Sequence, residues 1–427
     1  MGDVSAQTDK LMSSESFHAI TLTHGLKNFG YTTAEAIADL IDNSIEANAK
    51  NIEIIFWEGS ANPYVAIIDD GDGMLKDELE NAIKIKKTIS TSSNNIKLSK
   101  FGFGLKTASF SQCSDLTIIT KKKNQTNFKK INSNLQTTET NLLSLFKKFP
   151  FVEKKFNQRC SDSGTVVIWD GLHDNLTGKN SGIKRSHAIF YEKGKIFSEH
   201  ASTHFHNFLD KVKIYFNEIP IKNWDPFNKS LENLKTFEEK KIKLGDFYIT
   251  IKGYVYPKEE DFKNIEIYEK VSGPYGWFDS QGIYLYREKR LLSHGGWFGL
   301  RTGGQNHWQK ETKYERCRIT LNYDSQLDAY FKPNVQKTRA EIPPIIRGEV
   351  ASYCEMVRKS SLEKKVRENK IIELTDSTED LLVKNQDGKI EINLNHPNIE
   401  TLLNKNLSAT NKEFILSQLS KEIKKKL

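Results

Sequence analysis

The sequence contains no apolar run of the roughly 18 residues that a membrane-spanning helix needs, so we expect no membrane contact. Its opening residues, MGDVSAQTDK, show no basic segment followed by an apolar one, and we expect no signal peptide. The few cysteines are widely spaced and lack the short spacings of metal ligands: Cys113, Cys160, Cys317 and Cys354. We interpret them as reduced thiols, which predicts a cytoplasmic protein.

The chain also lacks a Walker A loop, a G-x-G-x-x-G turn and any visible internal repeat. What it has is length and aromatic content: 427 residues, with 24 Phe and 15 Tyr, are enough for two or three domains with their own cores. The net charge of +8 fits a solvated basic surface and contact with DNA or RNA equally well.

Apolar spacing in the first half predicts alternating helices and strands. We expect helices at about 33–47, at 75–87 and after the glycines near 102, and strands over 51–58, 64–70, 115–122 and 164–170. The Ser/Asn-rich stretch 88–100 is predicted to be a mobile loop. Residues 121–160 are predicted to form a hairpin or an insertion.

The second half is predicted to begin near residue 205 after a charged helix. Four segments there alternate as strands, namely KVKIYFN, FYITIKGYVYP, GIYLYREKRLL and CRITLNYD. Helices are expected near 340–370 and 398–426. The predicted domains are therefore 1–200, 201–345 and a helical C-terminal region, 346–427.

The first motif places an acid and an amide on one helical face. Asp39 and Asn43 are four residues apart in EAIADLIDNSIEA, which is about one helical turn. A carboxylate can accept a proton from an attacking water, and an amide oxygen suits Mg²⁺. Asp42 should point elsewhere, toward an arginine, a lysine or a helix neighbour. Taken alone, the segment fits an ordinary amphipathic helix with solvated acids.

The second motif, VAIIDDGDGM, places Asp69 at the end of a predicted buried strand. Gly71 and Gly73 let the backbone turn tightly and approach a ligand. A carboxylate only accepts hydrogen bonds, so it could bind the exocyclic amine of adenine. A plain acidic turn would have the same sequence.

Two further motifs follow. In KFGFGLKTASF, Gly102 and Gly104 precede a predicted helix, whose free N–H groups attract phosphate, and Lys106 adds a positive charge. In SGTVVIWDGL, Thr165 begins a strand, from which its hydroxyl could bind the same adenine edge or a bridging water. Either segment alone also fits a structural turn or strand.

The order of the four motifs is more specific than any one of them. Over residues 17–190 the chain resembles the ATPase superfamily of gyrase, heat-shock-90 chaperones, histidine kinases and MutL (GHKL). The segments LIDNSIEANAKNIEI and FGFGLKTASFSQCSDLTIITKK are most similar to MORC proteins and their bacterial relatives. The resemblance implies an α+β protein whose ATP-binding domain has the Bergerat fold, an α/β sandwich described as a mixed sheet covered on one face by helices.

The resemblance also implies roles for individual residues. ATP and Mg²⁺ would be the cofactors, Asn43 the metal ligand, Asp39 the catalytic base and 88–100 the lid. The implied nucleotide-binding residues are Asn43, Asp69, Gly71, Gly73, Met74, Gly102, Phe103, Gly104, Leu105, Lys106, Thr107 and Thr165. One departure matters: the family usually has Glu where this chain has Asp39, one methylene shorter. Misplacement of about 1 Å can cost roughly 100-fold in rate, so we expect slow hydrolysis.

In the second half, QGIYLYREKRLLSHGGW and FKPNVQKTRAE resemble the S5-like α/β transducer domain of MORC and MutL proteins. That resemblance implies that Lys337 is a second catalytic residue, which reaches the γ-phosphate; a solvated loop lysine is the alternative. The segment HGGWFGLRTGGQNHW could contact a partner through its tryptophans, or those side chains could pack against the core.

We therefore expect a slow, Mg²⁺-dependent ATPase that acts as an ATP-gated dimeric clamp or switch through its ATPase domain. Relatives of this kind act on DNA, and bacterial ones often lie beside defence genes. DNA, a protein partner encoded nearby and a role in antiviral defence follow as expectations. The alternative is a nucleotide-gated protein-binding module with little turnover. A histidine kinase is disfavoured because no phosphoacceptor-histidine helix pair precedes the pocket.

Overall fold

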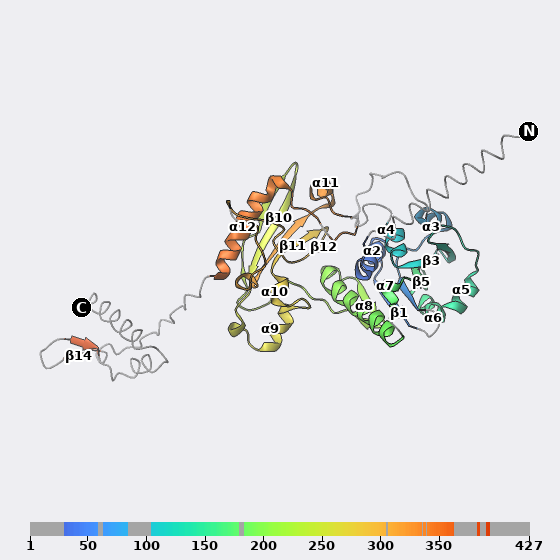
Figure 1. Ribbon diagram of the computed structural model, residues 1–427, viewed down its shortest axis with the longest axis horizontal. Helices are drawn as coiled ribbons and strands as arrows, with labels where there is room; N and C mark the ends of the chain where they lie inside the picture. Colours follow the sequence, from blue (N-terminus) through green and yellow to red (C-terminus); the bar gives the residue numbers. More distant parts are fainter. Residues whose placement is uncertain are drawn as a thin grey trace, which may run out of the picture. The chain divides into compact units, whose positions relative to one another are not determined.

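The computed structural model describes residues 30–58, 63–83, 104–178, 183–304, 306–334, 336–338 and 340–362, together with the short strands Leu382–Lys384 and Ile390–Ile392. The chain divides into two compact units, Met1–Leu362 and Glu363–Leu427 (Figure 1). The expected lid at 88–100, Gly102, Phe103 and the helix expected near 398–426 lie outside the described residues.

The first sheet has seven strands in the order β4-β3-β5-β2-β1-β6-β7. All neighbours are antiparallel except β1 and β6, which are parallel. The strands are β1 Asn51–Trp57, β2 Tyr64–Asp69, β3 Cys113–Lys122, β4 Gln125–Asn132, β5 Gly164–Leu172, β6 Lys213–Phe216 and β7 Ile219–Pro220. The predicted strands of the first half are thereby confirmed, and residues 121–160 begin with the β3–β4 hairpin.

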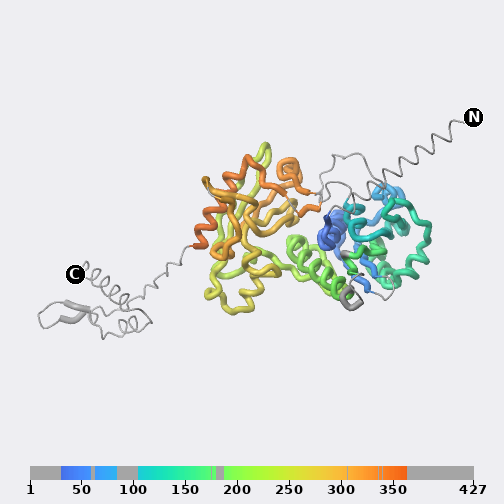
Figure 2. The backbone as a smooth tube through the Cα atoms, in the orientation of Figure 1, coloured from blue at the N-terminus to red at the C-terminus, as the bar shows by residue number. Residues whose placement is uncertain are grey.

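Helices cover both faces of this sheet. One face packs against α2 (Thr33–Glu46), α4 (Gly104–Phe110) and α8 (Ile183–His204), and Figure 2 shows the blue α2 beside the green α8. The other face packs against α5 (Leu142–Lys148) and α6 (Pro150–Arg159). The expectation of helices on one face was wrong, because β2 is buried at every residue and both of its faces need apolar cover.

Local signals explain where α2 begins. The Thr32 hydroxyl accepts a hydrogen bond from the Glu35 N–H, and the Glu35 carboxylate accepts one from the Thr32 N–H. This reciprocal capping box satisfies two backbone donors that a helix start leaves free. The helix confirms the prediction for 33–47 and holds both Asp39 and Asn43. The other short helices of this half are α3 Lys76–Ile83 and α7 Asp174–Thr177.

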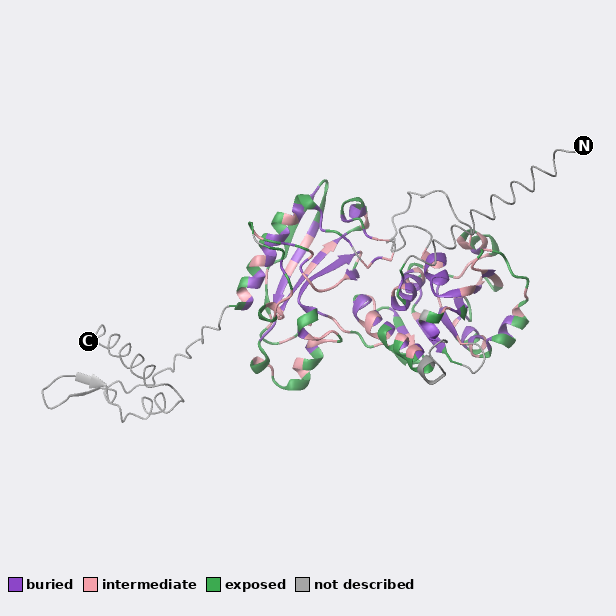
Figure 3. Ribbon diagram, in the orientation of Figure 1, coloured by how far each residue is buried: buried purple, intermediate pink, exposed green. Residues whose placement is uncertain are grey.

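The second sheet has six strands, with the order β12-β11-β13-β10-β8 and β9 also paired to β10. Their bounds are β8 Lys235–Thr236, β9 Lys240–Leu244, β10 Phe247–Val255, β11 Gly282–Arg287, β12 Arg290–Ser293 and β13 Cys317–Tyr323. One face packs on α12 (Pro344–Leu362). The other face is rich in tyrosine and packs against α9 (Ile265–Ser272) and α10 (Gly276–Ser280). Figure 3 shows the strands of both sheets as largely buried.

The structure corrects the predicted division of the chain at three places. KVKIYFN was assigned to the second domain, but β6 pairs with β1 in the first sheet. The boundary at 345 separates α12 from the sheet whose core it completes through Ile346, Val350 and Val357. The region 346–427 is not purely helical either, because β14 (Leu382–Lys384) pairs with β15 (Ile390–Ile392). Neither strand pairing nor core membership is visible in a local pattern.

Three smaller expectations concern side chains. All four cysteines are buried and unpaired, as expected of reduced thiols. Trp297 and Trp308 are buried and lie against the Arg358 guanidinium, so these tryptophans belong to the core. Among the residues that the structure describes, no helix is both long enough and apolar enough to span a bilayer.

Candidate nucleotide-binding site

A cavity of about 250 Å³ lies between α2 and the first sheet. It is lined by seven residues that the sequence assigned to nucleotide binding, Asn43, Asp69, Gly73, Met74, Gly104, Leu105 and Thr165, and by Leu40, Ser44, Ala47, Ile67, Ala82, Ile118 and Val167. All four motifs thus contribute residues to one cavity, which is mainly apolar and has a few polar groups. That composition is typical of small-molecule sites.

Asp69 stands at the cavity end of β2 and is almost fully buried. One carboxylate oxygen accepts a 2.8 Å hydrogen bond from the Ser44 hydroxyl, and the other accepts a 2.9 Å bond from the Gly71 N–H. Burial raises the pKa of Asp69 to about 6, against the effect of these two donors. Each oxygen keeps a further lone pair, so at neutral pH the carboxylate can still accept a hydrogen bond from a ligand amine.

Two neighbouring groups fix the wall around Asp69. Thr165 pairs with Asp69 across β5 and β2, and its hydroxyl lies 3.1 Å from that of Thr120. The Thr120 hydroxyl lies 2.8 Å from the Met74 N–H, which donates to it. Gly73 adopts a left-handed φ of +65°, and a Cβ there would lie 1.9 Å from the Lys121 carbonyl oxygen. Its glycine is required by that backbone contact as well as by the turn.

Asp39 lies one helical turn before Asn43 and is buried beside the start of α4. The Tyr31 hydroxyl donates a 2.7 Å hydrogen bond to Asp39 Oδ2, and Lys337 Nζ lies 3.3 Å from Oδ1. A Cβ on Gly104 would lie 3.7 Å from Oδ2, which places the acid next to the glycine of the third motif. Burial raises the pKa of Asp39, although Lys337 and Tyr31 act to lower it.

Asp42 is fully buried and points away from the cavity, as expected. Its Oδ2 accepts a 2.8 Å hydrogen bond from Lys337, and its Oδ1 accepts a 3.1 Å bond from Arg290 of β12. The prediction that Asp42 holds an arginine or a lysine is confirmed with one of each. Burial opposes the charge of Lys337, but Asp42 and Asp39 together raise its pKa.

Lys106 does not line the cavity, although Ala82, which it contacts, does. Its side chain is buried, and its ammonium lies 3.1 Å from the Ile83 carbonyl and 3.4 Å from the Ala82 carbonyl, at the end of α3. A lysine in this position stabilises the carbonyl end of a helix. Thr107 is buried one position later and donates to the Gly104 carbonyl. Phosphate binding by Lys106 and Thr107 therefore stays a prediction.

Comparison with known proteins agrees with this geometry. Residues 31–165 match the model of the family described as histidine kinase-, DNA gyrase B-, and HSP90-like ATPase. Residues 31–165 are therefore similar to a GHKL ATPase domain. The mixed sheets with their covering helices fit an α+β protein of this superfamily, and the match supports ATP binding.

Individual relatives show which part of the chain carries the similarity. The chain is 33% identical over 87 residues to ATPase morc-1 of Caenorhabditis elegans, which is 20% of this chain and 10% of that protein. It is 51% identical over 49 residues to the DNA mismatch repair protein MutL of Clostridium beijerinckii, and 45% identical over 49 residues to that of Clostridium botulinum. Each MutL match covers 12% of this chain and 7% of the relative. The chain thus spans a tenth or less of each.

The cavity beside α2 also fits the metal that the resemblance to the superfamily implies. Asn43 lines the cavity, is half-buried, and its amide has no hydrogen-bond partner among the described residues. An amide oxygen is a suitable ligand for Mg²⁺, which takes few protein ligands when it binds a nucleotide. Asn43 is therefore the residue of this chain that would hold the ion.

Sequence reasoning about the site missed three residues. Ser44 orients Asp69, Tyr31 donates to Asp39, and Arg290 neutralises Asp42. Ser44 could have been identified from the sequence, because it follows Asn43 directly on the predicted helix. No local pattern connects Arg290 with Asp42, because 248 residues separate them.

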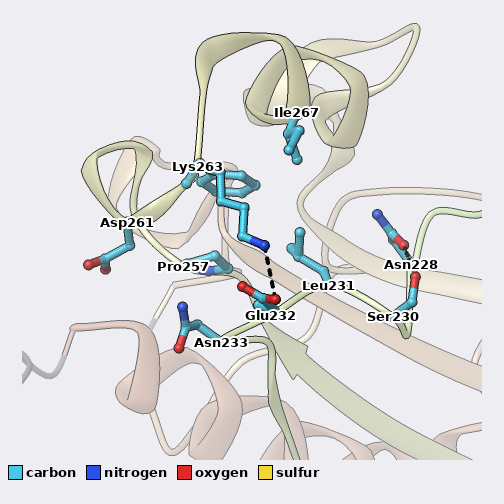
Figure 4. Close-up of a pocket in the computed structure, with 10 residues that line it drawn as sticks. Asn228, Ser230, Leu231, Glu232, Asn233, Pro257, Asp261, Lys263 and Ile267 are labelled. Atoms are coloured by element: carbon cyan, nitrogen blue, oxygen red, sulfur yellow. Dashed lines mark hydrogen bonds and ion pairs between the residues drawn. The ribbon is translucent and has the colours of Figure 1, made fainter.

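A second cavity, of about 320 Å³, lies in the other half of the same unit and contains none of the predicted nucleotide residues. Polar and apolar residues both line it, and the Lys263 ammonium lies 3.0 Å from the Glu232 carboxylate (Figure 4). Both of these side chains are largely exposed. The buried polar groups converge instead at the smaller cavity beside α2.

Proposed function

We propose that the chain binds Mg²⁺-ATP in the cavity beside α2 and hydrolyses it slowly. The observation that carries this proposal is that Asn43, Asp69 and Gly104, from three separate motifs, line one cavity, with Asp39 buried beside Gly104. Asp69 recognises the adenine amine, Asn43 holds Mg²⁺, and Asp39 accepts the proton of the attacking water. The metal, when bound, neutralises charge on the phosphates.

Lys337 completes the proposed site from the second sheet. In the structure its ammonium is held by Asp42 and Asp39. A bound γ-phosphate offers a stronger concentration of negative charge, so the lysine transfers to it when ATP binds. The glycine segment from Gly104, with Leu105, Lys106 and Thr107, borders the phosphates. This part of the proposal extends the S5-like resemblance of residues 201–345.

Nucleotide binding would then be communicated between the two sheets, and two copies of the chain would close as a clamp through their ATPase domains. The net charge of +8 makes DNA a reasonable ligand of that clamp in the cytoplasm. A nearby-encoded protein partner and a role in antiviral defence complete the proposal.

The proposed chemistry is tested by Asp39→Asn, which keeps the shape of the side chain and removes the base. We expect turnover in a phosphate-release assay to fall by about 100-fold, with calorimetric affinity for a non-hydrolysable analogue unchanged. Unchanged turnover in the variant would reject Asp39 as the base. A wild-type protein without calorimetric response to Mg²⁺-ATP would reject the whole proposal.

The second candidate is a nucleotide-gated protein-binding module with little turnover. The observation that favours it is that both Asp39 oxygens are already occupied, by Tyr31 and Lys337. Crosslinking and DNA mobility shift, each with and without the analogue, separate the candidates. Analogue-dependent dimers that bind DNA support the clamp, whereas analogue-dependent dimers without DNA affinity support the module.

A further inference from the structure

Tyr31 lies just before α2 and its side chain is 6% exposed. Its hydroxyl donates a 2.7 Å hydrogen bond to Asp39 Oδ2. Burial, followed by the charge of Asp39, raises the pKa of Tyr31 far above its ordinary value. The hydroxyl consequently stays protonated at neutral pH and remains a hydrogen-bond donor.

The position of Tyr31 is itself fixed by a second element. The fully buried Gln112 follows α4, and its amide nitrogen lies 3.4 Å from the Tyr31 carbonyl oxygen. The Gln112 amide oxygen accepts a 2.9 Å bond from the Thr33 hydroxyl. The residues on either side of the α2 N-cap are therefore tied to the end of α4, which holds the backbone from which the tyrosine ring reaches Asp39.

The two groups that contact the Asp39 carboxylate, Lys337 and Tyr31, differ in their other acid partners. Lys337 Nζ lies 3.3 Å from Asp39 but 2.8 Å from Asp42, so its closer bond is to the other acid. Tyr31 has Asp39 as its acid partner and comes from the segment that leads into the same helix. When Lys337 transfers to a nucleotide, Tyr31 is the group that remains on the carboxylate.

We propose that Tyr31 is a positioning residue for Asp39, fixing the orientation of the shorter acid so that its free lone pairs face the attacking water. Asp has one side-chain torsion fewer than Glu and a shorter reach, so its carboxylate orientation decides whether it contacts the water at all. The inference rests on the proposed function, because it assigns Tyr31 a role through the proposed base.

The test is Tyr31→Phe, which removes only the hydroxyl. We expect kcat for ATP hydrolysis to fall by about 10-fold or more, with KM and analogue affinity unchanged because Tyr31 does not line the cavity. Tyr64→Phe is the matched control: this buried tyrosine of β2 has a hydroxyl with no hydrogen-bond partner, and its removal should leave kcat unchanged. Thermal unfolding of both variants checks that the fold is intact.

A double-mutant cycle with Asp39→Asn separates positioning from a general structural effect. If Tyr31 acts through Asp39, Tyr31→Phe costs nothing further once the base has been removed. Losses that multiply in the double variant, or a Tyr31→Phe protein with wild-type kcat, overturn the inference while the ATPase proposal stands. A wild-type protein that binds ATP without turnover overturns the inference together with the catalytic part of the proposal.

Discussion

Lys337 donates a 2.8 Å hydrogen bond to Asp42, although 295 residues separate the two in the chain. Both side chains are buried, and Arg290 binds the opposite oxygen of the same carboxylate. Arg290 and Lys337, which come from the half of the unit that holds the second sheet, thus both contact Asp42. This acid lies on α2, the helix that also carries Asp39 and Asn43. Removing charges from water is costly unless they are paired, so this contact fixes the α2 surface against residues 290 and 337.

The first prediction concerns Lys337→Ala. We expect ATP turnover to fall by about 10-fold or more, because the lysine is proposed to stabilise charge on the γ-phosphate. Phosphate release measures turnover, and calorimetry with a non-hydrolysable analogue measures binding. Lys332→Ala is the matched control, since Lys332 is exposed on the same loop and should be neutral. Equal turnover in both variants would contradict the role of Lys337.

The second prediction concerns pH and Asp69. The carboxylate must be ionised to accept the adenine amine, so we expect ATP affinity to fall as the pH drops through about 6. Calorimetric titrations between pH 5 and pH 8, a range chosen around that pKa, measure this fall. An affinity that stays constant across this range would contradict adenine recognition by Asp69.

The third prediction uses the same pKa for stability. The pKa of Asp69 is raised from 3.8 to about 6 in the folded state. Its contribution to the free energy of unfolding is therefore fully present at low pH and is lost as the pH rises through about 6. The free energy of unfolding should therefore fall by up to about 3 kcal/mol as the pH rises through about 6, and Asp69→Asn should lose both this pH dependence and nucleotide binding. Asp72→Asn, an exposed acid in the same turn, should change neither quantity. Urea unfolding and calorimetry measure both.

The fourth prediction concerns Gly73→Ala. The added methyl group would collide with the Lys121 carbonyl oxygen at a left-handed backbone position. We expect destabilisation by about 3 kcal/mol or more in urea unfolding. Gly348→Ala is the control, because that glycine lies inside α12 with open space around it and alanine should stabilise the helix by ~1 kcal/mol. A neutral Gly73→Ala would show that the turn can relax.

The elements that carry the predicted site residues could be predicted because their signals are local. The capping box and apolar spacing define α2, and the four-residue interval places Asp39 and Asn43 one turn apart on it. The β-branched run before Asp69 predicts a buried strand that ends at a glycine turn. The order of these motifs also identified the superfamily, because each one is a short segment with a fixed backbone requirement.

The predictions failed where pairing or packing joins distant segments. β6 reads as a strand in either half, and only its parallel pairing with β1 assigns it to the first sheet. The helices α5 and α6 lie in a stretch whose sequence did not indicate which face of the sheet they would cover. Lys106 follows the expected glycines, yet its ammonium lies against the Ala82 and Ile83 carbonyls at the end of α3, a contact that no local pattern predicts.

By itself the sequence determined the local elements and the identity of the chemical groups, since helix caps, strand runs and glycine turns act over a few residues. Tertiary structure alone decided which groups meet: Tyr31 with Asp39, and Asp42 with Arg290 and Lys337. The physical reason is that buried charges and hydroxyls must find partners wherever the packed sheets and helices bring them. No local sequence pattern records that choice.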